Sequence, residues 1–216
     1  MSSLADAAAA EVMREFSENG CVIRRHILSA AEIATLQTAA GNLARVAECN
    51  PRDAFYNYYL PHRTNKGVLY DVYHRDPDFR RVAESPNLIS FIRRVLGKEF
   101  YLFENSVVYK PRVKENAVPW HQDFMYTKGD PEKAIVWIAL DKIDESNGCL
   151  HVLPGTHKSG ALPRLEVKGE THAKRTNRRY ADERKAVLVI MEPGDALICN
   201  QYLLHSFKRV DVDAKR

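Results

Sequence analysis

The sequence is poor in the features that mark disulfide-bonded, zinc-binding and membrane proteins. Its four cysteines are scattered along 216 residues without a CxxC pair: Cys21, Cys49, Cys149 and Cys199. Three of them lie in apolar runs, which favours buried reduced thiols over a zinc site or a disulfide framework. No apolar stretch approaches the ~20 residues that span a bilayer. The sequence therefore predicts a reduced globular protein that does not insert into a membrane.

A strong excess of one charge is also missing. The formal net charge of +4 is small for this length, so we expect neither nucleic-acid nor membrane binding. The N-terminus carries acids early and lacks the basic segment of a signal peptide, which predicts a cytoplasmic location. With 45% apolar and 28% charged residues, the composition fits one globular domain over residues 1–216. We expect a monomer or a weak homo-oligomer.

Helical patterns dominate the N-terminal part, about residues 1–97. Residues 4–17 place their apolar side chains on one stripe, as an amphipathic helix does. Ser29–Glu32 is a capping-box pattern that opens a second helix. Pro77 and Pro86 each follow a residue suited to capping, so each is expected to begin a short helix.

The pattern changes after this helical part, from about residue 98 to residue 216. Short apolar runs rich in β-forming residues alternate with turns that contain glycine, proline or asparagine. The runs are 100–109, 118–124, 134–140, 149–153, 186–191 and 196–207. Helices followed by strands predict a mainly β jelly roll, similar to a cupin, with the helices packed on one face.

The strand predicted at 118–124 contains a candidate metal site. Residues two apart in a strand project from the same face, so His121 and Asp123 can converge. An imidazole beside a carboxylate suits a divalent metal, and a distant histidine would complete a facial triad. His205, at the end of the apolar segment 197–204, is one candidate for this third ligand. The residues alone leave the other histidines open as alternatives: His26, His62, His74, His151, His157 and His172.

A series of motifs follows in order along the chain. The segments are FSENG at 16–20, LSAAE at 28–32, FRRVAESPNLISFIRRVLG at 79–97, PWHQD at 119–123, WIALD at 137–141, NGCL at 147–150, LPGTHK at 153–158, and Gly194-Asp195 ahead of His205. This series resembles the phytanoyl-CoA dioxygenase family. The resemblance covers nearly the whole chain from Glu15 onward.

The resemblance implies a double-stranded β-helix that binds Fe(II) through His121, Asp123 and His205. It also implies 2-oxoglutarate and O2 as cosubstrates, with ascorbate as a stimulating reductant. The expected reaction hydroxylates an unactivated C–H bond of a small-molecule metabolite and releases succinate and CO2. Related halogenases lack the carboxylate at the position of Asp123, so its presence favours hydroxylation. Desaturation and cyclisation use the same ligands and stay open.

The family holds the far carboxylate of 2-oxoglutarate with an arginine beyond the distal histidine. Arg216 stands eleven residues after His205 and is our candidate, with Arg209 as the poorer alternative. A guanidinium fits a carboxylate through two parallel hydrogen bonds. Relatives usually continue past this arginine, so we expect a β core that is cut short, or an unusually short last strand.

Three other residues resemble positions near the cosubstrate. Trp137 follows the metal motif by one strand, and Lys66 stands in an Asn-Lys-Gly turn. Core packing and an exposed loop lysine explain them equally well. Ser206 stands next to Phe207, where relatives often carry a serine, so a hydroxyl contact to the cosubstrate is shifted or lost.

Several polar and aromatic segments could border a substrate. The residues expected there are Phe124, Met125 and Tyr126 after the metal motif, and Tyr56, Tyr58, Tyr59 and Tyr70 at the mouth. The basic insertion at 172–185 is either a solvated loop or a lid over the site. Its lysines and arginines weakly favour an anionic substrate.

Two other function classes remain open. One is a jelly-roll binding or regulatory module that keeps the metal site but has weak catalysis, and Arg216 is the residue that discriminates it. The other is a metal-dependent isomerase or epimerase, which would work without oxygen.

Overall fold

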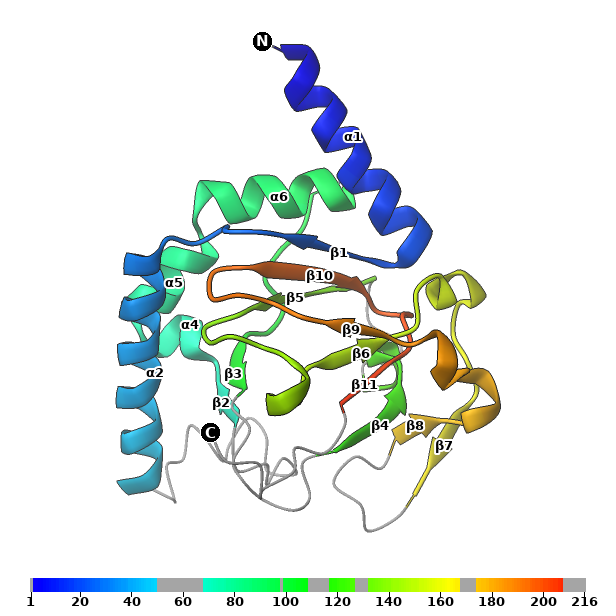
Figure 1. The fold of residues 1–216 in the computed structure, drawn as a ribbon. Helices are drawn as coiled ribbons and strands as arrows, with labels where there is room; N and C mark the ends of the chain where they lie inside the picture. Colours follow the sequence, from blue (N-terminus) through cyan, green and yellow to red (C-terminus); the bar gives the residue numbers. More distant parts are fainter. Residues whose placement is uncertain are drawn as a thin grey trace.

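The computed structural model describes residues 2–49, 68–97, 99–108, 117–126, 132–167 and 174–207, and the statements below concern these residues. Two sheets face each other in the centre of the molecule (Figure 1). The three-stranded sheet has the order β1 (Cys21–Arg24), β10 (Ala196–Asn200), β5 (Ala134–Ile138). The four-stranded sheet has the order β4 (Val118–His121), β11 (His205–Phe207), β6 (Leu150–Val152), β9 (Val187–Val189). The expected jelly-roll class, with strands in facing sheets, is confirmed.

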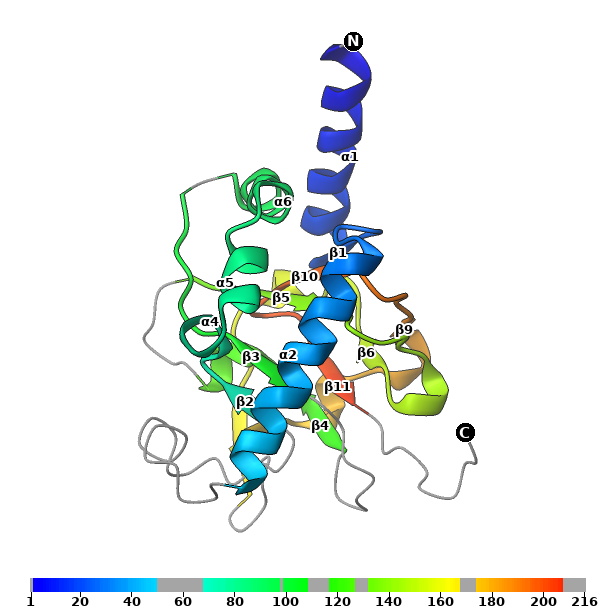
Figure 2. The same ribbon diagram turned by 90° about the vertical axis from the view of Figure 1, so that its left-hand side faces the viewer.

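The helices gather against the three-stranded sheet (Figures 1 and 2). They are α1 (Ser2–Asn19), α2 (Ala30–Cys49), α4 (Val72–Arg75), α5 (Pro77–Ala83) and α6 (Pro86–Leu96). The N-terminal half of α1 extends beyond the body of the molecule in both views. Within the described residues, no helix combines the length and the apolar character that crossing a membrane requires.

The predicted helix starts are confirmed by their hydrogen bonds. The backbone N–H of Ser29 donates to the Glu32 carboxylate at 2.7 Å, and the Glu32 N–H donates to the Ser29 hydroxyl at 3.3 Å. Asp76 accepts from the backbone of α5, and Ser85 accepts from the backbone of α6. Each cap satisfies a backbone donor that the first turn of a helix leaves without a partner.

The two faces of strand β10 divide the core into two layers. Ala196 and Ile198 pack against the helices. Leu197 and Cys199, one residue out of phase, pack between the two sheets. This follows from the alternation of side chains along a strand. All four are 3% exposed or less, so β10 contributes buried side chains to both layers of the core.

The observed strands are shorter than the apolar runs that suggested them; among the described residues of the run 100–109, for example, only Ser106–Val108 form a strand. Two of these differences affect the site. The run 118–124 stops being a strand at His121, because residues Asp123–Tyr126 turn into the 3-10 helix η1. The run 196–207 contains two strands, because Asn200 accepts a hydrogen bond from the Tyr202 N–H at 2.9 Å and closes a turn. The chain thereby passes from the three-stranded sheet into the four-stranded sheet, where β11 begins with His205.

Two small two-stranded sheets complete the β structure. In one, β2 (Val68–Tyr70) pairs with β3 (Ser106–Val108); in the other, β7 (Arg164–Glu166) pairs with β8 (Lys174–Thr176). The described part of the basic insertion therefore contains a strand, followed by the 3-10 helices η4 (Arg178–Tyr180) and η5 (Glu183–Lys185). Strand β8 lies against β4. A plain solvated loop does not describe this part of the insertion.

Candidate metal centre

Two histidines face each other across neighbouring strands of the four-stranded sheet. His205, the first residue of β11, is directly opposite His121, the last residue of β4. The centroids of their rings are 4.1 Å apart. Both residues are buried, at 5% and 4% exposed for His121 and His205. The sheet register therefore places two imidazoles at one point.

Asp123 brings a carboxylate to the same point. Its Oδ1 is 3.7 Å from the Nε2 of His121, and its Oδ2 is 3.6 Å from the Nε2 of His205. One ligand atom from each of the three residues lies within 4.8 Å of the others. The Asp123 side chain is 31% exposed. The cluster is thus buried on its imidazole side and accessible on its carboxylate side.

The hydrogen bonds of the two rings orient them for metal binding. The Nδ1 of His121 is 2.8 Å from the Pro119 carbonyl oxygen, and the Nδ1 of His205 is 3.0 Å from the Leu203 carbonyl oxygen. A carbonyl oxygen can only accept, so each Nδ1 carries the proton. Each Nε2 faces Asp123 and is the ring nitrogen that can bind a metal. This is the tautomer that metal-binding histidines require, fixed by a backbone acceptor.

The convergence of His121 and Asp123 has a different cause from the one inferred from the sequence. We expected both on one face of a strand, but β4 ends at His121 and Asp123 begins η1. The turn between them brings the carboxylate back towards the ring. Likewise His205 begins a strand where we expected it to end one.

Gln122, which the sequence analysis passed over, fixes that turn. It is 0% exposed. Its amide nitrogen donates to the carbonyl oxygens of Gly160 at 2.9 Å and Tyr202 at 2.7 Å, and its amide oxygen accepts from the Leu162 N–H at 2.9 Å. The Phe124 N–H also donates to the Gln201 carbonyl at 3.2 Å. The segment with Asp123 is thereby tied to the turn that leads to His205. The one available signal in the sequence is a polar residue inside an apolar run.

The other described histidines lie outside this cluster. His74 contacts the Asp71 carboxylate at 2.6 Å, and the Nε2 of His157 is 3.1 Å from the Ser17 carbonyl oxygen. Burial lowers the pKa of His157 below its ordinary value. A side chain at Gly20 would collide with this ring, since an added Cβ would lie 2.4 Å from its Nδ1. His157 therefore supports the turn between α1 and β1.

The other two described histidines lie on a strand and in a turn. His151 lies on β6 opposite Ser206, and His26 lies in the turn after β1. His62 and His172 lie outside the described residues.

Trp137 and Ser206 lie on strands of the two facing sheets. Trp137 lies on β5, packs in the layer between the sheets, and contacts Phe207 with ring centroids 5.8 Å apart. Ser206 follows His205 directly and is buried. Strand alternation directs its hydroxyl to the face opposite His205. The geometry gives no direct support to a cosubstrate contact by Ser206, whereas the place of Trp137 between the sheets fits either of the two roles expected for it.

Several expected site residues lie outside the described residues. They are Arg216, Arg209, Lys66, Tyr56, Tyr58 and Tyr59. Tyr70 is described and is only 7% exposed, so it belongs to the core rather than to the mouth of a site.

Tyr126 is the aromatic residue that contacts the centre directly. Its ring packs edge-on against His121, with centroids 5.7 Å apart. Its hydroxyl donates to the Lys174 carbonyl oxygen at 3.1 Å, and the Lys174 ammonium is 5.5 Å from the ring centroid. Thr176 also contacts the sulfur of the buried Met125, at 3.8 Å. Strand β8 of the basic insertion therefore borders the candidate metal centre.

The Gly194-Asp195 motif supports the sheet from a distance. Asp195 is 0% exposed and accepts from the Arg25 guanidinium at 2.6 Å and from the backbone N–H of His26 and of Glu192, each at 2.9 Å. Burial by itself would raise the pKa of Asp195, but these hydrogen bonds and the charge of Arg25 hold it below its ordinary value. The carboxylate anchors the turns next to β1 and β10.

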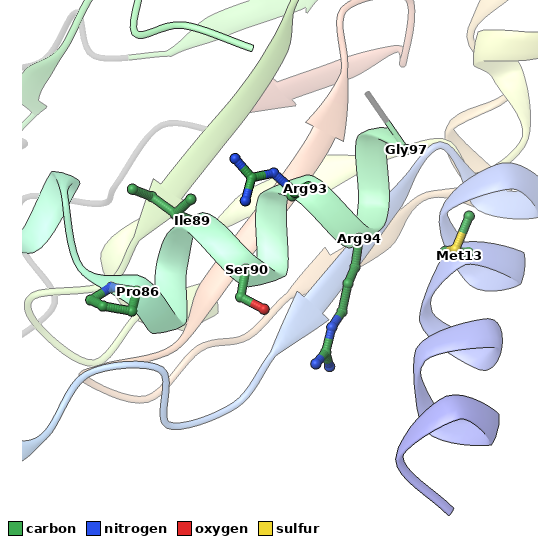
Figure 3. Close-up of a pocket in the computed structure, with 7 residues that line it drawn as sticks. All are labelled: Met13, Pro86, Ile89, Ser90, Arg93, Arg94 and Gly97. Atoms are coloured by element: carbon green, nitrogen blue, oxygen red, sulfur yellow. The ribbon is translucent and has the colours of Figure 1, made fainter. Parts of the chain in front are cut away.

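A surface hollow of about 620 Å³ lies elsewhere, between α1 and α6 (Figure 3). Met13 borders it from α1, and Ile89, Arg93 and Arg94 border it from α6. It shares no residue with the cluster of His121, Asp123 and His205.

His121, Asp123 and His205 lie within a segment of the chain that matches a known family. Residues 16–209 match the family model described as phytanoyl-CoA dioxygenase (PhyH). The chain belongs to this family. The match begins in α1 and runs past β11, so it includes all three members of the candidate metal centre.

Individual relatives agree with this membership of the PhyH family. The peroxisomal phytanoyl-CoA dioxygenase of Bos taurus is 26% identical over 215 residues, covering 92% of this chain and 63% of the relative. The chain thus spans less than two thirds of the length of that relative. The solved structure of EctD from S. alaskensis with 2-oxoglutarate and 5-hydroxyectoine has a TM-score of 0.71 at 23% identity, covering 97% of this chain and 71% of that one. The epimerase SnoN, in complex with Fe3+, alpha ketoglutarate and nogalamycin RO, has a TM-score of 0.68 at 18% identity, covering 95% and 79%. These structures show the same fold.

Proposed function

We propose that this PhyH-family chain is an Fe(II)- and 2-oxoglutarate-dependent oxygenase, and that residues 1–216 carry the activity as one domain. The observation that supports the proposal most is the meeting of His121, Asp123 and His205 with both Nε2 atoms turned to the carboxylate. Two imidazoles and one carboxylate form the ligand set of non-haem iron oxygenases and leave coordination positions open.

The charges of the site fit such a metal. An imidazole that keeps its Nδ1 proton on a carbonyl oxygen and binds a metal through Nε2 adds no charge to the site. Asp123 then offsets one of the two positive charges of a ferrous ion, and a carboxylate of 2-oxoglutarate supplies compensating charge. Burial of the imidazoles limits water on that side, and the Asp123 side chain, 31% exposed, is the member of the cluster that solvent reaches.

The chemistry belongs to the bound groups, and the protein positions them. When bound, iron, 2-oxoglutarate and O2 supply an oxidant strong enough for an unactivated C–H bond, with succinate and CO2 as products and ascorbate as a stimulant. His121 and His205 hold their two positions through the rigid β4–β11 pairing. The hydrogen bonds of Gln122 keep the neighbouring Asp123 carboxylate at the third ligand position.

For the cosubstrate we propose Arg216 as the residue that binds the far carboxylate of 2-oxoglutarate, with a supporting role for Lys66. The reasons are the resemblance to the family and the fit of a guanidinium to a carboxylate. For Trp137 the proposal is a wall of the cosubstrate pocket, based on its place between the two sheets.

For the substrate we propose a small metabolite with an anionic group. Strand β8 presents Lys174 next to Tyr126, whose ring contacts His121. Within the described part of the chain, no carboxylate forms an ion pair with Lys174. An ammonium beside Tyr126 would attract an anionic group of a substrate at the border of the metal centre.

The proposal is tested by measuring succinate release from the purified chain with Fe(II), 2-oxoglutarate and ascorbate in air. We expect turnover above that of the His121→Ala variant, and faster turnover with a suitable metabolite from an anionic panel. The matched control is His74→Ala, an exposed histidine away from the centre, which should keep full turnover. Absence of succinate, together with no 2-oxoglutarate binding by calorimetry, would favour a binding module instead.

A second candidate function is epimerisation, which the fold shared with the epimerase SnoN brings forward. The two functions differ in what happens to oxygen atoms. Under ¹⁸O2, a hydroxylase incorporates the label into its product, whereas an epimerase returns the product without it. An oxygen-independent isomerase would also keep its rate in an anaerobic assay.

A further inference from the structure

Two cysteines face each other on neighbouring strands of the three-stranded sheet. Cys21 begins β1 and Cys199 lies on β10, and the antiparallel register places them directly opposite each other. Both side chains belong to the layer between the two sheets, in which Leu197 and Trp137 also pack. Neighbouring strands therefore present two thiols on the same face at the same level.

The backbone hydrogen bonds between β1 and β10 show whether Cys21 and Cys199 form a hydrogen-bonded or a non-hydrogen-bonded pair. The Asn200 N–H donates to the Gly20 carbonyl oxygen at 2.8 Å, so Gly20 and Asn200 form a hydrogen-bonded pair. The next pair along, Cys21 and Cys199, is then of the non-hydrogen-bonded type, in which Cα atoms lie about 4.5 Å apart. Disulfides span Cα separations from about 4.4 Å upward. A bridge can form here without separating the strands, but at the short limit, where strain makes it easier to reduce.

The environments of the two thiols differ in a way that suits sequential oxidation. Cys21 is partly exposed, whereas Cys199 is only 3% exposed. A hydrogen bond between the thiols lowers the pKa of Cys21 and raises that of Cys199 well above its ordinary value; burial and the charge of Asp123 act in the same direction on Cys199. Cys21 is thus the thiol that reagents reach and that ionises more easily, and Cys199 is the protonated partner beneath it.

We propose that Cys21 and Cys199 form a redox-active dithiol, a modification site at which a peroxide converts the two thiols reversibly into a cross-strand disulfide. The first step attacks the peroxide with the Cys21 thiolate, breaks the O–O bond and gives a sulfenic acid at Cys21 with release of hydroxide or alkoxide. In the second step the Cys199 sulfur attacks the Cys21 sulfur, the S–O bond breaks, and hydroxide leaves. The protons of both thiols end in the released water or alcohol, so the dithiol loses two electrons and the peroxide gains them.

The position of the pair makes its state relevant to the fold around the centre. Cys199 is followed by the turn that Asn200 and Gln122 hold, and that turn leads to His205. The disulfide would lock β1 to β10 immediately before this turn. The proposal stands on the strand register and does not depend on the oxygenase function.

Trypsin separates the four cysteines cleanly, which makes the test direct. Cleavage after lysine and arginine puts them in different peptides, 15–24 for Cys21, 46–52 for Cys49, 143–158 for Cys149 and 186–208 for Cys199. The reduced full-length chain is treated with graded hydrogen peroxide in the presence of a chelator, alkylated, and mapped without reduction by mass spectrometry. We expect peptide 15–24 joined to peptide 186–208, with loss of two hydrogen atoms, and full recovery of both thiols with dithiothreitol.

Three variants separate the pair from unspecific oxidation. Cys21→Ser should abolish the linked peptides and leave Cys199 reduced, because Cys199 is buried. Cys199→Ala should leave Cys21 as a sulfenic acid that dimedone traps. The matched control Cys149→Ala, which removes a fully buried thiol (0% exposed), should give an unchanged yield of the linked peptides.

The proposal is overturned if Cys21 proceeds to sulfinic acid in the wild type without linkage, or if links to Cys49 or Cys149 form equally fast. It is also overturned if only disulfides between chains appear. A variant that fails to fold by circular dichroism is replaced by Cys21→Ala, since Cys21 is partly exposed. A titration with glutathione buffers completes the test; a bridge that stays intact at every ratio of reduced to oxidised glutathione contradicts reversibility.

Discussion

His121 and His205 are paired residues on adjacent antiparallel strands, and their rings are 4.1 Å apart between centroids. Because each ring is also held by a carbonyl oxygen two residues earlier in the chain, the two Nε2 atoms are oriented before any ligand arrives. A site prepared in this way loses little conformational entropy when a metal binds.

Removing one member of the triad should abolish metal binding and leave the fold. We expect His121→Ala, Asp123→Ala and His205→Ala each to weaken the affinity for Co(II), used as a spectroscopic substitute for iron, by more than about 100-fold, since loss of a mere supporting contact already costs about 10–100-fold. Absorption titration of the metal-free protein measures this. His74→Ala is the control, and unchanged affinity in a triad variant would remove that residue from the ligand set.

Replacing Gln122 with leucine should weaken both stability and metal binding. The variant leaves the Gly160 and Tyr202 carbonyls and the Leu162 N–H without their partner in a fully buried place, and each such loss costs about 1–3 kcal/mol. We expect the affinity for Co(II) to fall about tenfold or more. Urea unfolding and the same titration measure the two effects.

The matched control for Gln122→Leu is Leu36→Ala in α2, which removes a side chain from the helical layer of the core. It should lower the free energy of unfolding by about 2–5 kcal/mol and leave the affinity for Co(II) unchanged. If both variants weaken metal binding in proportion to their stability, Gln122 has no positioning role.

Asp195 should make stability depend on pH in the acid range. Its pKa is lowered in the folded state from the ordinary value of 3.8. Its contribution is therefore fully present above about pH 4 and is lost as the pH falls through the lower, folded value. Asp195→Asn removes this contribution, because the amide must turn a donor towards Arg25 or a backbone N–H; we expect a cost of about 1–3 kcal/mol at pH 6. The difference between wild type and variant in urea unfolding should shrink as the pH approaches 3, and a constant difference would contradict the assignment.

The proposed cosubstrate residue can be separated from the proposed metal ligands. Arg216→Ala should raise the concentration of 2-oxoglutarate needed for half-maximal succinate release at least about tenfold, as loss of a charged hydrogen bond of about 1.5–3 kcal/mol predicts. The affinity for Co(II) should stay the same. Arg209→Ala is the control with a similar position in the sequence. A larger effect in Arg209→Ala would exchange the two roles.

Local signals in the sequence predicted most of the helices and the class of fold. Ser29 and Ser85 cap the first turns of helices, and Gly97 ends a helix. Neighbouring residues alone were therefore enough to predict these helix ends. The meeting of His121 with His205 needed the register of two strands distant in sequence, which periodicity does not contain. Only the resemblance of the motif series to a family predicted that His121 and His205 bind the same metal. In the structure the two residues lie opposite each other on paired strands.

Turns inside apolar runs, and the contacts that hold them, could not be predicted from the sequence. Residues 196–207 look continuous in hydrophobicity, yet the hydrogen bond from Tyr202 to Asn200 splits them and moves the chain between sheets. The role of Gln122 could not be predicted from its place in an apolar run alone, because its three partners come from two segments far along the chain. Such partners are set by tertiary structure and not by local propensity.

The place of β1 at the margin of the three-stranded sheet has a practical consequence. Strand β1 is the outer neighbour of β10 and covers one side of its backbone. A shortened chain that began after Arg24 would leave the amides and carbonyls of β10 open to strand addition by another molecule. Recombinant versions that trim the first helix should therefore retain Cys21–Arg24 to remain free of aggregation.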